Sequence, residues 1–345
     1  MDVRDRTTGG GALTERSARW AHEVAWEGEV ETYGAESNPT GNPIGGGAGY
    51  AEIFAAGDHT VRDYDALRDA LESAKAGQVV FVPGDAEIDM GGRPALAIPE
   101  GVTLASTRGR DGSPGGRVFS DTLATPGFFA TAGDCVRITG VRAQGPYPDR
   151  DRIDVDSRGI GSAHFGMEID NCDISGFRSS ATYFGVGASR AYVHHNHIHH
   201  NQQAGLGYGV SVGGAFVLIE GNLFDWCRHH IASSGLPGSG YEARYNFCGA
   251  HANGHLFDMH GGRDRGDATD IAGDWMNLHH NTFVATDVRS MGIRGVPSQG
   301  AKIHHNWFYS SDPENAVRTS GNTEVYENVY GSEKTLIQRW EAENG

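Results

Sequence analysis

Polar side chains that could bind acids and transfer protons recur just ahead of a series of spaced glycines. The glycines that end these segments are Gly187, Gly213, Gly235, Gly261, Gly295 and Gly321. At one alternate set of positions before them stand Tyr208, His230, Asp258, His260, Arg294 and Arg318. The other set carries Phe257, Met259, Met291, Ile293 and Val317. Because successive side chains of a strand point to opposite faces, the polar set should face solvent and the apolar set should fill a core.

Arginines in this polar set suit the recognition of a carboxylate. A guanidinium can grip a carboxylate through two parallel hydrogen bonds, and we expect Arg294, with Arg289 or Arg318, to do so. The other side chains that we expect to contact a ligand are Asp258, Arg263, Arg228 and Tyr241. Arg228 begins an Arg-His-His run between two expected strands.

The histidines and the tyrosine suit proton transfer. A neutral imidazole can remove a proton from carbon, and a tyrosine hydroxyl can return one to a departing oxygen. We therefore expect His260 or His230 to act as base and Tyr208 as acid. Asp258 lies two residues before His260 on the same expected face, where it could orient the imidazole or bind a cation.

A short repeat predicts the elements that would position these residues. An apolar residue, two variable residues and an asparagine recur, with Cys172 in the asparagine slot of the first copy. The asparagines are Asn196, Asn222, Asn246, Asn281, Asn306 and Asn328, and the spacings from Cys172 onward are 24, 26, 24, 35, 25 and 22 residues. Three short strands and three turns need about that length. We therefore predict an all-β fold, a right-handed parallel β-helix whose asparagines stack in a column. Asparagine itself is expected in the left-handed backbone at each bend.

The rest of the chain fits around this solenoid. Residues 63–76 place Tyr64, Leu67 and Leu71 on one helical face, which predicts an α-helix that caps the first coil. We predict a polar, glycine-rich extension over residues 1–58, a β-helix domain over 59–335 and a tail over 336–345. The long spacing before Asn281 contains an insertion at 261–274, rich in aspartate and arginine, which could be a substrate lid, a calcium site or only a solvated loop.

Paired histidines precede three of the asparagines, at 194–195, 279–280 and 304–305. The repeat alone explains these pairs, so we assign no metal to the histidine-rich segment 194–200. The aspartates of the insertion could bind calcium, which is the one cofactor that the sequence suggests.

Composition narrows the classes of function. The net charge of −16 argues against a nucleic-acid partner, because phosphate binding needs a basic face. Only three of the 28 basic residues in the 345-residue chain are lysines, which is typical either of a halophilic source or of an ordinary acidic secreted protein. No apolar stretch is long enough to span a membrane, and residues 1–50 lack an apolar signal core. We nevertheless expect a secreted protein, and the sequence leaves monomer and homo-oligomer open.

Four features together resemble the pectate-lyase-like β-helix superfamily over residues 60–335. They are the expected helix, the strand Val-Val-Phe-Val-Pro-Gly at 79–84, the segment Ile-Pro-Glu-Gly-Val-Thr-Leu at 98–104 and the asparagine ladder. The run Leu-His-His-Asn-Thr-Phe at 278–283, followed by Arg289 and Arg294, resembles the pectate lyase stretch that ends in RxPxxR, with Met291 in place of proline. That resemblance implies Arg289 as a base and Arg294 as a substrate ligand.

The resemblance and the polar set together favour a polysaccharide lyase that cleaves a uronate-containing polysaccharide by β-elimination. A glycoside hydrolase or transferase is an alternative, with Asp258 paired to Asp225, Glu242 or an aspartate of the insertion. A C5 epimerase would use the same base but return the proton. A non-catalytic β-helix surface protein is the third alternative.

Overall fold

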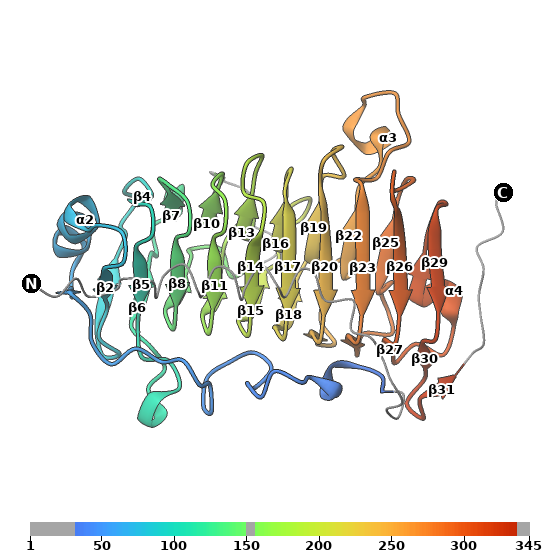
Figure 1. The fold of residues 1–345 in the computed structure, drawn as a ribbon, viewed down its shortest axis with the longest axis horizontal. Helices are drawn as coiled ribbons and strands as arrows, with labels where there is room; N and C mark the ends of the chain where they lie inside the picture. Colours follow the sequence, from blue (N-terminus) through green and yellow to red (C-terminus); the bar gives the residue numbers. More distant parts are fainter. Residues whose placement is uncertain (1–31, 150–155, 337–345) are drawn as a thin grey trace, which may run out of the picture. The chain divides into compact units, whose positions relative to one another are not determined.

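The computed structural model describes residues 32–149 and 156–336. Over these residues the chain is a right-handed parallel β-helix, as the repeat predicted. Three sheets, which we call A, B and C, run along it (Figure 1). Each coil adds one strand to sheet A, then one to sheet B and one to sheet C. Neighbouring strands pair in parallel throughout, except for the last pair of sheet B, which is antiparallel.

The strands are short, as a coil of about 25 residues requires. Sheet A contains β1 (His59–Thr60), β2 (Val79–Phe81), β5 (Thr103–Ala105), β8 (Arg137–Thr139), β11 (Glu168–Asp170), β14 (Ala191–His194), β17 (Phe216–Glu220), β20 (Gly240–Arg244), β23 (Trp275–His279), β26 (Gly300–His304) and β29 (Thr323–Tyr326). Sheet B contains β3 (Glu87–Asp89), β6 (Arg117–Phe119), β9 (Arg142–Gln144), β12 (Asp173–Ser175), β15 (His197–Asn201), β18 (Leu223–Cys227), β21 (Phe247–Cys248), β24 (Thr282–Phe283), β27 (Trp307–Phe308), β30 (Val329–Tyr330) and β31 (Thr335–Leu336). Sheet C contains β4 (Leu96–Ile98), β7 (Gly127–Thr131), β10 (Arg158–Ser162), β13 (Ser180–Phe184), β16 (Tyr208–Val212), β19 (His229–Ser233), β22 (Phe257–Met259), β25 (Met291–Ile293) and β28 (Val317–Arg318).

The core is a set of stacked columns inside the coils. The apolar residues expected there, Phe257, Met259, Met291, Ile293 and Val317, are all buried. The rings of Phe283 and Phe308, one coil apart on sheet B, stack at 5.1 Å. Because aligned apolar side chains meet across every pair of coils, each coil buries its inner face only when its neighbours are in place.

The asparagine column is present and is continuous from Asn196 to Asn328. Each side-chain amide donates to the amide oxygen of the next asparagine, as between Asn196 Nδ2 and Asn222 Oδ1 at 3.0 Å. The same oxygen also accepts the backbone N–H of the asparagine one coil earlier. Cys172 begins the column, since its backbone N–H donates to Asn196 Oδ1 at 2.9 Å.

The left-handed residue of each bend is not the asparagine, and that expectation was wrong by one position. Positive φ angles fall on the residue before it, at Asn171, His195, Gly221, Tyr245, His280, His305 and Glu327. The asparagine instead supplies the hydrogen bonds that the bend needs. Its preference for this slot therefore comes from its side-chain amide, which can donate and accept along the column.

Helix α2 (Tyr64–Ser73) covers the first coils as predicted, although it ends three residues before Ala76. Asp63 caps its N-terminus by accepting the backbone N–H of Ala66 at 2.9 Å. Leu67 and Leu71 are buried against the core. The remaining helical turns are η1 (Ala35–Ser37), η2 (Arg110–Gly112), α3 (Gly262–Arg265) and α4 (Pro313–Ala316). Within the described ranges, no helix is long and apolar enough to cross a membrane.

Residues 33–58 form a strap that crosses successive coils in reverse order (Figure 1, blue segment). The backbone N–H of Gly34 donates to the carbonyl of His305 at 3.0 Å, and that of Gly45 donates to Gly221 at 2.8 Å. Farther along, the N–H of Gly47 donates to Asn171 Oδ1 at 2.8 Å. The strap therefore covers the left-handed bends that precede the asparagine column. Of the expected extension 1–58 and tail 336–345, residues 1–31 and 337–345 lie outside the described ranges.

Candidate active site on the nine-stranded sheet

Sheet C carries two outward columns of polar side chains. The first follows the register Arg158, Ser180, Tyr208, His229. The second follows Tyr183, Ser211, Ala232, Asp258, Gly292, Arg318. Strands one coil apart lie about 4.8 Å from each other, so residues far apart in sequence become neighbours on this face. The expected alignment of the polar set along one sheet is confirmed for Tyr208, Asp258 and Arg318.

Asp258, on β22, is the centre of the densest polar cluster. Its carboxylate is fully buried and accepts from Arg294 twice, from Nε at 3.0 Å and from Nη2 at 2.8 Å. His255 Nε2 lies 3.1 Å from Oδ1, and His260 Nε2 lies 3.0 Å from Oδ2. His229 Nε2 is 3.7 Å from Oδ2. One carboxylate therefore holds three imidazoles and one guanidinium in place.

Burial and hydrogen bonding set the charges of this cluster. Burial alone would raise the pKa of Asp258, but hydrogen bonds from His255 and His260 and the nearby His229 and Arg294 hold it well below its usual range. Burial lowers the pKa of His229 to about 3, against the opposing pull of Asp258. At neutral pH the site therefore contains an ionised carboxylate beside a neutral His229, whose Nδ1 contacts the carbonyl oxygen of His255.

Tyr208, His229 and His255 form a row of rings across adjacent coils. The rings of Tyr208 and His229 stack with centroids 5.6 Å apart, and those of His229 and His255 are 4.9 Å apart. Arg228 Nη1 donates to the Tyr208 hydroxyl at 3.5 Å. Tyr208 and His255 are partly exposed, whereas His229 is buried. A ligand on this face can thus touch Tyr208 and His255 directly, with His229 packed between them.

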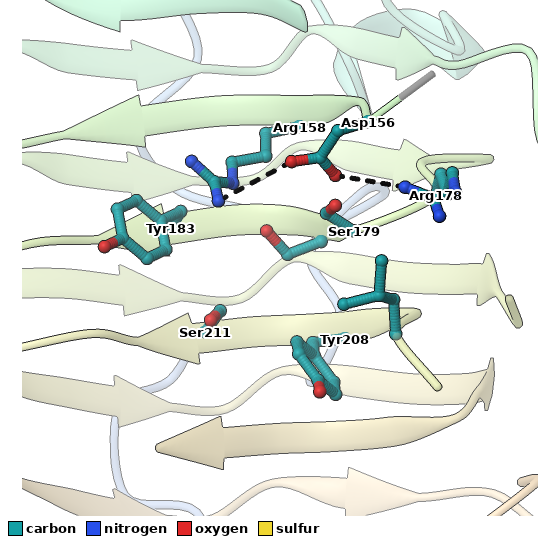
Figure 2. Close-up of a pocket in the computed structure, with 9 residues that line it drawn as sticks. Asp156, Arg158, Arg178, Ser179, Tyr183, Tyr208 and Ser211 are labelled. Carbon is teal, nitrogen blue, oxygen red and sulfur yellow. Dashed lines mark ion pairs between the residues drawn. The ribbon is translucent and has the colours of Figure 1, made fainter. Parts of the chain in front are cut away.

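A pocket of about 290 Å³ adjoins Tyr208 on the side of the earlier coils. It is lined by Asp156, Arg158, Arg178, Ser179, Ser180, Tyr183, Leu206, Tyr208 and Ser211 (Figure 2). Asp156 lies between two arginines, 3.8 Å from Arg158 Nη2 and 3.5 Å from Arg178 Nη1. Arg158 also lies over the ring of Tyr183, at 4.4 Å from its centroid. The pocket thus presents two cations and aromatic surface to a ligand.

Two expected site residues do not reach this face. His230 is fully buried, and its ring stacks on Phe224 in the core at 5.5 Å. The alternation of β19 breaks at its start, so that His230 and Ile231 both point inward and His229 points toward Asp258. Tyr241, on β20 of sheet A, is buried in the core, where burial raises the pKa of its hydroxyl. We therefore remove His230 and Tyr241 from the candidate site.

The remaining arginines occupy different places along the groove. Arg318 is exposed at the far end of the second column. Arg289 precedes β25, and its Nε is buried without a hydrogen-bond partner. The insertion contains α3, and there Arg263 is exposed, while Asp264 accepts from Arg294 Nη1 at 2.8 Å. Arg294 is therefore bound by two carboxylates of the protein and is not free to clamp a third.

Three aspartates of the insertion, Asp264, Asp267 and Asp274, accept hydrogen bonds from other groups of the chain. Asp267 accepts from Arg265 Nε at 2.8 Å and from the Thr269 hydroxyl at 2.7 Å. In the described ranges, three clusters of histidines and carboxylates are close enough to share an ion, and none includes these aspartates. Calcium binding by the insertion stays a prediction.

A hydrolase would need a second carboxylate across the groove from Asp258. Asp225 belongs to β18 of sheet B and Glu242 to β20 of sheet A, so both lie on other faces of the coil. Asp264 is near, but it shares Arg294 with Asp258. Neither of these two carboxylates is free to act as a nucleophile or as an acid.

Sequence reasoning singled out the Arg-His-His run at 228–230 but chose His230 over His229, and it missed His255 and the arginines of the pocket, Arg158 and Arg178. Arg178 and His255 stand in the turns that lead from sheet B into sheet C, where strand alternation gives no direction for the side chain. Arg158 lies on β10, in an earlier coil without the asparagine, and the register to Tyr208 that would have found it is visible only in the paired strands.

Comparisons with known proteins place the chain by its fold. No family model matches the sequence, and no curated protein matches it. Among solved structures, an alginate lyase from Paenibacillus sp. str. FPU-7 is similar, with a TM-score of 0.53. The two sequences are 16% identical, and the match covers 81% of this chain and 97% of that chain. At this identity the likeness shows a shared β-helix fold.

Proposed function

We propose that the protein is a polysaccharide lyase that cleaves a uronate-containing chain by β-elimination on sheet C. One observation carries the proposal: Tyr208 joins a pocket containing two arginines to the imidazole cluster on Asp258. A sugar carboxylate in the pocket would sit next to groups able to take and give a proton. The fold of the alginate lyase, a protein named for this type of reaction, supports the same class. We also propose that the chain belongs to the pectate-lyase-like superfamily, which its capping helix and asparagine column support.

Arg158 and Arg178 are proposed to neutralise the carboxylate of the sugar. Neutralisation makes the neighbouring C5 proton more acidic, because the charge that develops at C5 can spread into the carboxyl group. Asp156 holds the two guanidinium groups on either side of itself, so they face the ligand in a fixed geometry. Arg228, Arg318, Arg263 and Arg289 remain proposed contacts to other sugars of the chain.

A base then removes the C5 proton, and we propose an imidazole held by Asp258. His255 is the first candidate, because its ring packs on His229, which in turn packs on Tyr208. His260, bound to the other carboxylate oxygen, is the second candidate. As the C5–H bond breaks, its electron pair forms the C4–C5 double bond and the C4–O bond breaks. Tyr208 gives its proton to the departing oxygen, and the unsaturated sugar leaves.

Products from a panel of polysaccharides test this proposal. Alginate, pectate, ulvan and glycosaminoglycans should be compared with neutral glycans, with both ultraviolet absorbance of the unsaturated sugar and reducing ends measured. We expect absorbance with at least one acidic chain and its loss by at least about 100-fold in Tyr208→Phe, the general-acid contribution. Tyr326→Phe, on sheet A, is the matched control and should keep full activity.

The panel also separates the alternatives. Reducing ends without absorbance would mean a hydrolase and would overturn the lyase assignment. Proton exchange at C5 without cleavage would mean an epimerase. If no glycan gives a product, the non-catalytic surface protein is the alternative that remains. Because the proposed substrate is a polymer, we also propose that the enzyme is secreted.

A further inference from the structure

A second cluster of histidines lies on sheet B, away from the candidate active site. Asp173 on β12 and His197 and His199 on β15 each offer one ligand atom, and these atoms lie within 4.8 Å of one another. Asp173 and His197 are register partners one coil apart, and His199 follows His197 by two residues on the same outward face. We propose that these three side chains bind a divalent transition-metal ion of the Zn²⁺ type.

The distances match the spacing that a small ion requires. His197 Nδ1 is 3.2 Å from Asp173 Oδ2, and His199 Nε2 is 3.2 Å from Asp173 Oδ1. Zinc binds imidazole nitrogen and carboxylate oxygen at about 2.0–2.2 Å, which puts two ligands of a tetrahedral ion roughly 3.3 Å apart. Two nitrogens and one oxygen are a common ligand set for zinc sites that keep a position open for water.

The cluster is open to solvent on one side. The side chains of His197, His199 and Asp173 are 30%, 19% and 27% exposed. An ion can therefore reach the ligands, and water can complete its coordination.

His199 also has the support that metal ligands usually have. Its Nδ1 lies 2.6 Å from His200 Nδ1, so the ring nitrogen that does not face Asp173 is hydrogen-bonded. Such a second contact fixes the tautomer and the orientation of a ligating imidazole. His200 in turn stacks on Trp226 at 5.6 Å.

The absence of an arginine distinguishes this cluster from the two others like it. In the candidate active site, Arg294 binds Asp258 with two hydrogen bonds. On sheet A, Arg137 does the same to Asp170. Among the described residues, no arginine or lysine forms an ion pair with Asp173, whose ion-pair partners there are the two imidazoles. An arginine thus binds the carboxylate directly in two clusters, whereas Arg108 acts on Asp173 only through its charge and forms no ion pair with it.

The repeat does not explain these histidines either. The pairs at 194–195, 279–280 and 304–305 precede the ladder asparagine and recur from coil to coil. His197 and His199 follow the asparagine, and the same two slots in the next coils hold Leu223 and Asp225, then Phe247 and Gly249. The His-x-His pair therefore belongs to one coil only, and it lies between Asp173 of the preceding coil and Asp225 of the next, of which only Asp173 forms ion pairs with it.

Zinc titration of the whole protein tests the site. The chain is stripped with a chelator, and Zn²⁺ uptake is measured by calorimetry, with Co²⁺ absorption as a report on nitrogen ligands. We expect the double variant His197→Ala/His199→Ala to bind at least about 100-fold more weakly and His200→Ala about 10-fold more weakly. The control His279→Ala removes another histidine that pairs with a carboxylate, at 3.2 Å from Glu242 on sheet A, and should bind as the parent does.

Melting temperatures show whether each variant is folded and whether Zn²⁺ stabilises it. Zn²⁺ should raise the melting temperature of the parent and not that of the double variant, while the two melt alike without metal. Should the double variant be unfolded, His199→Gln replaces it as the reduced-affinity variant. The proposal is wrong if the parent takes up no Zn²⁺, if the double variant binds as tightly as the parent, or if His279→Ala loses the ion. Because the cluster is on sheet B, these outcomes do not depend on the lyase proposal.

Discussion

At the scale of single residues, Asp258 sets the electrostatics of the candidate active site. Replacing it by asparagine leaves Arg294 and three imidazoles around a neutral amide in a fully buried position. Arg294 is 36% exposed and keeps its pairing with Asp264, so the cost is that of buried groups losing charged hydrogen-bond partners, and we expect Asp258→Asn to lower the free energy of unfolding by about 1–3 kcal/mol. Urea denaturation at pH 7 measures it. Asp264→Asn, whose carboxylate is partly exposed, should change the stability by less than about 1 kcal/mol.

His230 should make the protein sensitive to acid. Burial lowers the pKa of His230 to about 4, whereas the unfolded chain titrates near its ordinary value of about 6.5. Between these two values the unfolded state binds a proton that the folded state does not, so stability is full above about pH 6.5 and falls as pH drops toward 4. His230→Phe keeps a ring on Phe224 and removes the titration.

We therefore expect His230→Phe to lose less stability than the parent between pH 7 and pH 5. Denaturation curves at the two pH values give the difference directly. His260→Phe serves as the control, because His260 is partly exposed. An equal fall in the parent and in His230→Phe would contradict the assignment of acid sensitivity to this side chain.

The sequence could predict which strands carry polar residues but not where alternation fails. Asp258 and Arg318 were found because they follow the period of two along sheet C. Tyr208 also points outward, although it lies three residues before Ser211, the next outward side chain of its strand. The sequence assigned His230 to the outward face in place of His229, because two consecutive residues of β19, His230 and Ile231, point inward. Whether a strand keeps its period at its first residue depends on the turn before it, and that turn has no repeating sequence here.

At the scale of elements, the asparagine column is the feature that holds one coil on the next. Asn222 accepts two hydrogen bonds from Asn196 and donates to Val193 and Asn246, all in a fully buried position. Asn222→Ala leaves buried donors and acceptors without partners, each of which costs about 1–3 kcal/mol. We expect a loss of roughly 3 kcal/mol or more of unfolding free energy, measured by urea denaturation.

A matched replacement tests the reason for that loss. Cys172 already stands in the asparagine slot of an earlier coil, at the end of the column, where it has a single asparagine neighbour. Cys172→Ala should therefore cost distinctly less than Asn222→Ala, because it removes no side-chain amide. Equal losses would mean that the bend, and not the column, provides the stability.

The column is also the element that the sequence predicts best. Its asparagines recur at the spacing of one coil, and the spacing alone sets the number of strands in a turn of the solenoid. A segment without periodicity can wrap the outside of the coils, but the path of the strap was beyond prediction, because residues 33–58 bind largely through backbone N–H groups of glycines. Such contacts depend on the shape of the surface they cover and leave no pattern of side chains in the sequence.

At the scale of the whole described unit, the strap alters how the coils depend on one another. In a solenoid each coil contacts only its neighbours, so unfolding can begin locally and spread. The strap adds contacts between distant coils: Ala35 donates to Thr282 Oγ1 at 2.9 Å, and the hydroxyl of Tyr50 donates to Asp170 Oδ2 at 2.9 Å. When a central coil opens, it therefore also breaks its contacts with the strap, to which the neighbouring coils are bound as well.

Deleting residues 1–58 should make unfolding less cooperative as well as less favourable. With the strap gone, the coils keep only nearest-neighbour contacts, so tryptophan fluorescence and far-ultraviolet circular dichroism should stop giving coincident transitions. The matched control deletes residues 1–31 and keeps every strap contact described above. We expect that control to retain a single transition on both probes. If the longer deletion also unfolds in one coincident step, neighbouring coils alone provide the cooperativity, and the strap serves only to cover their bends.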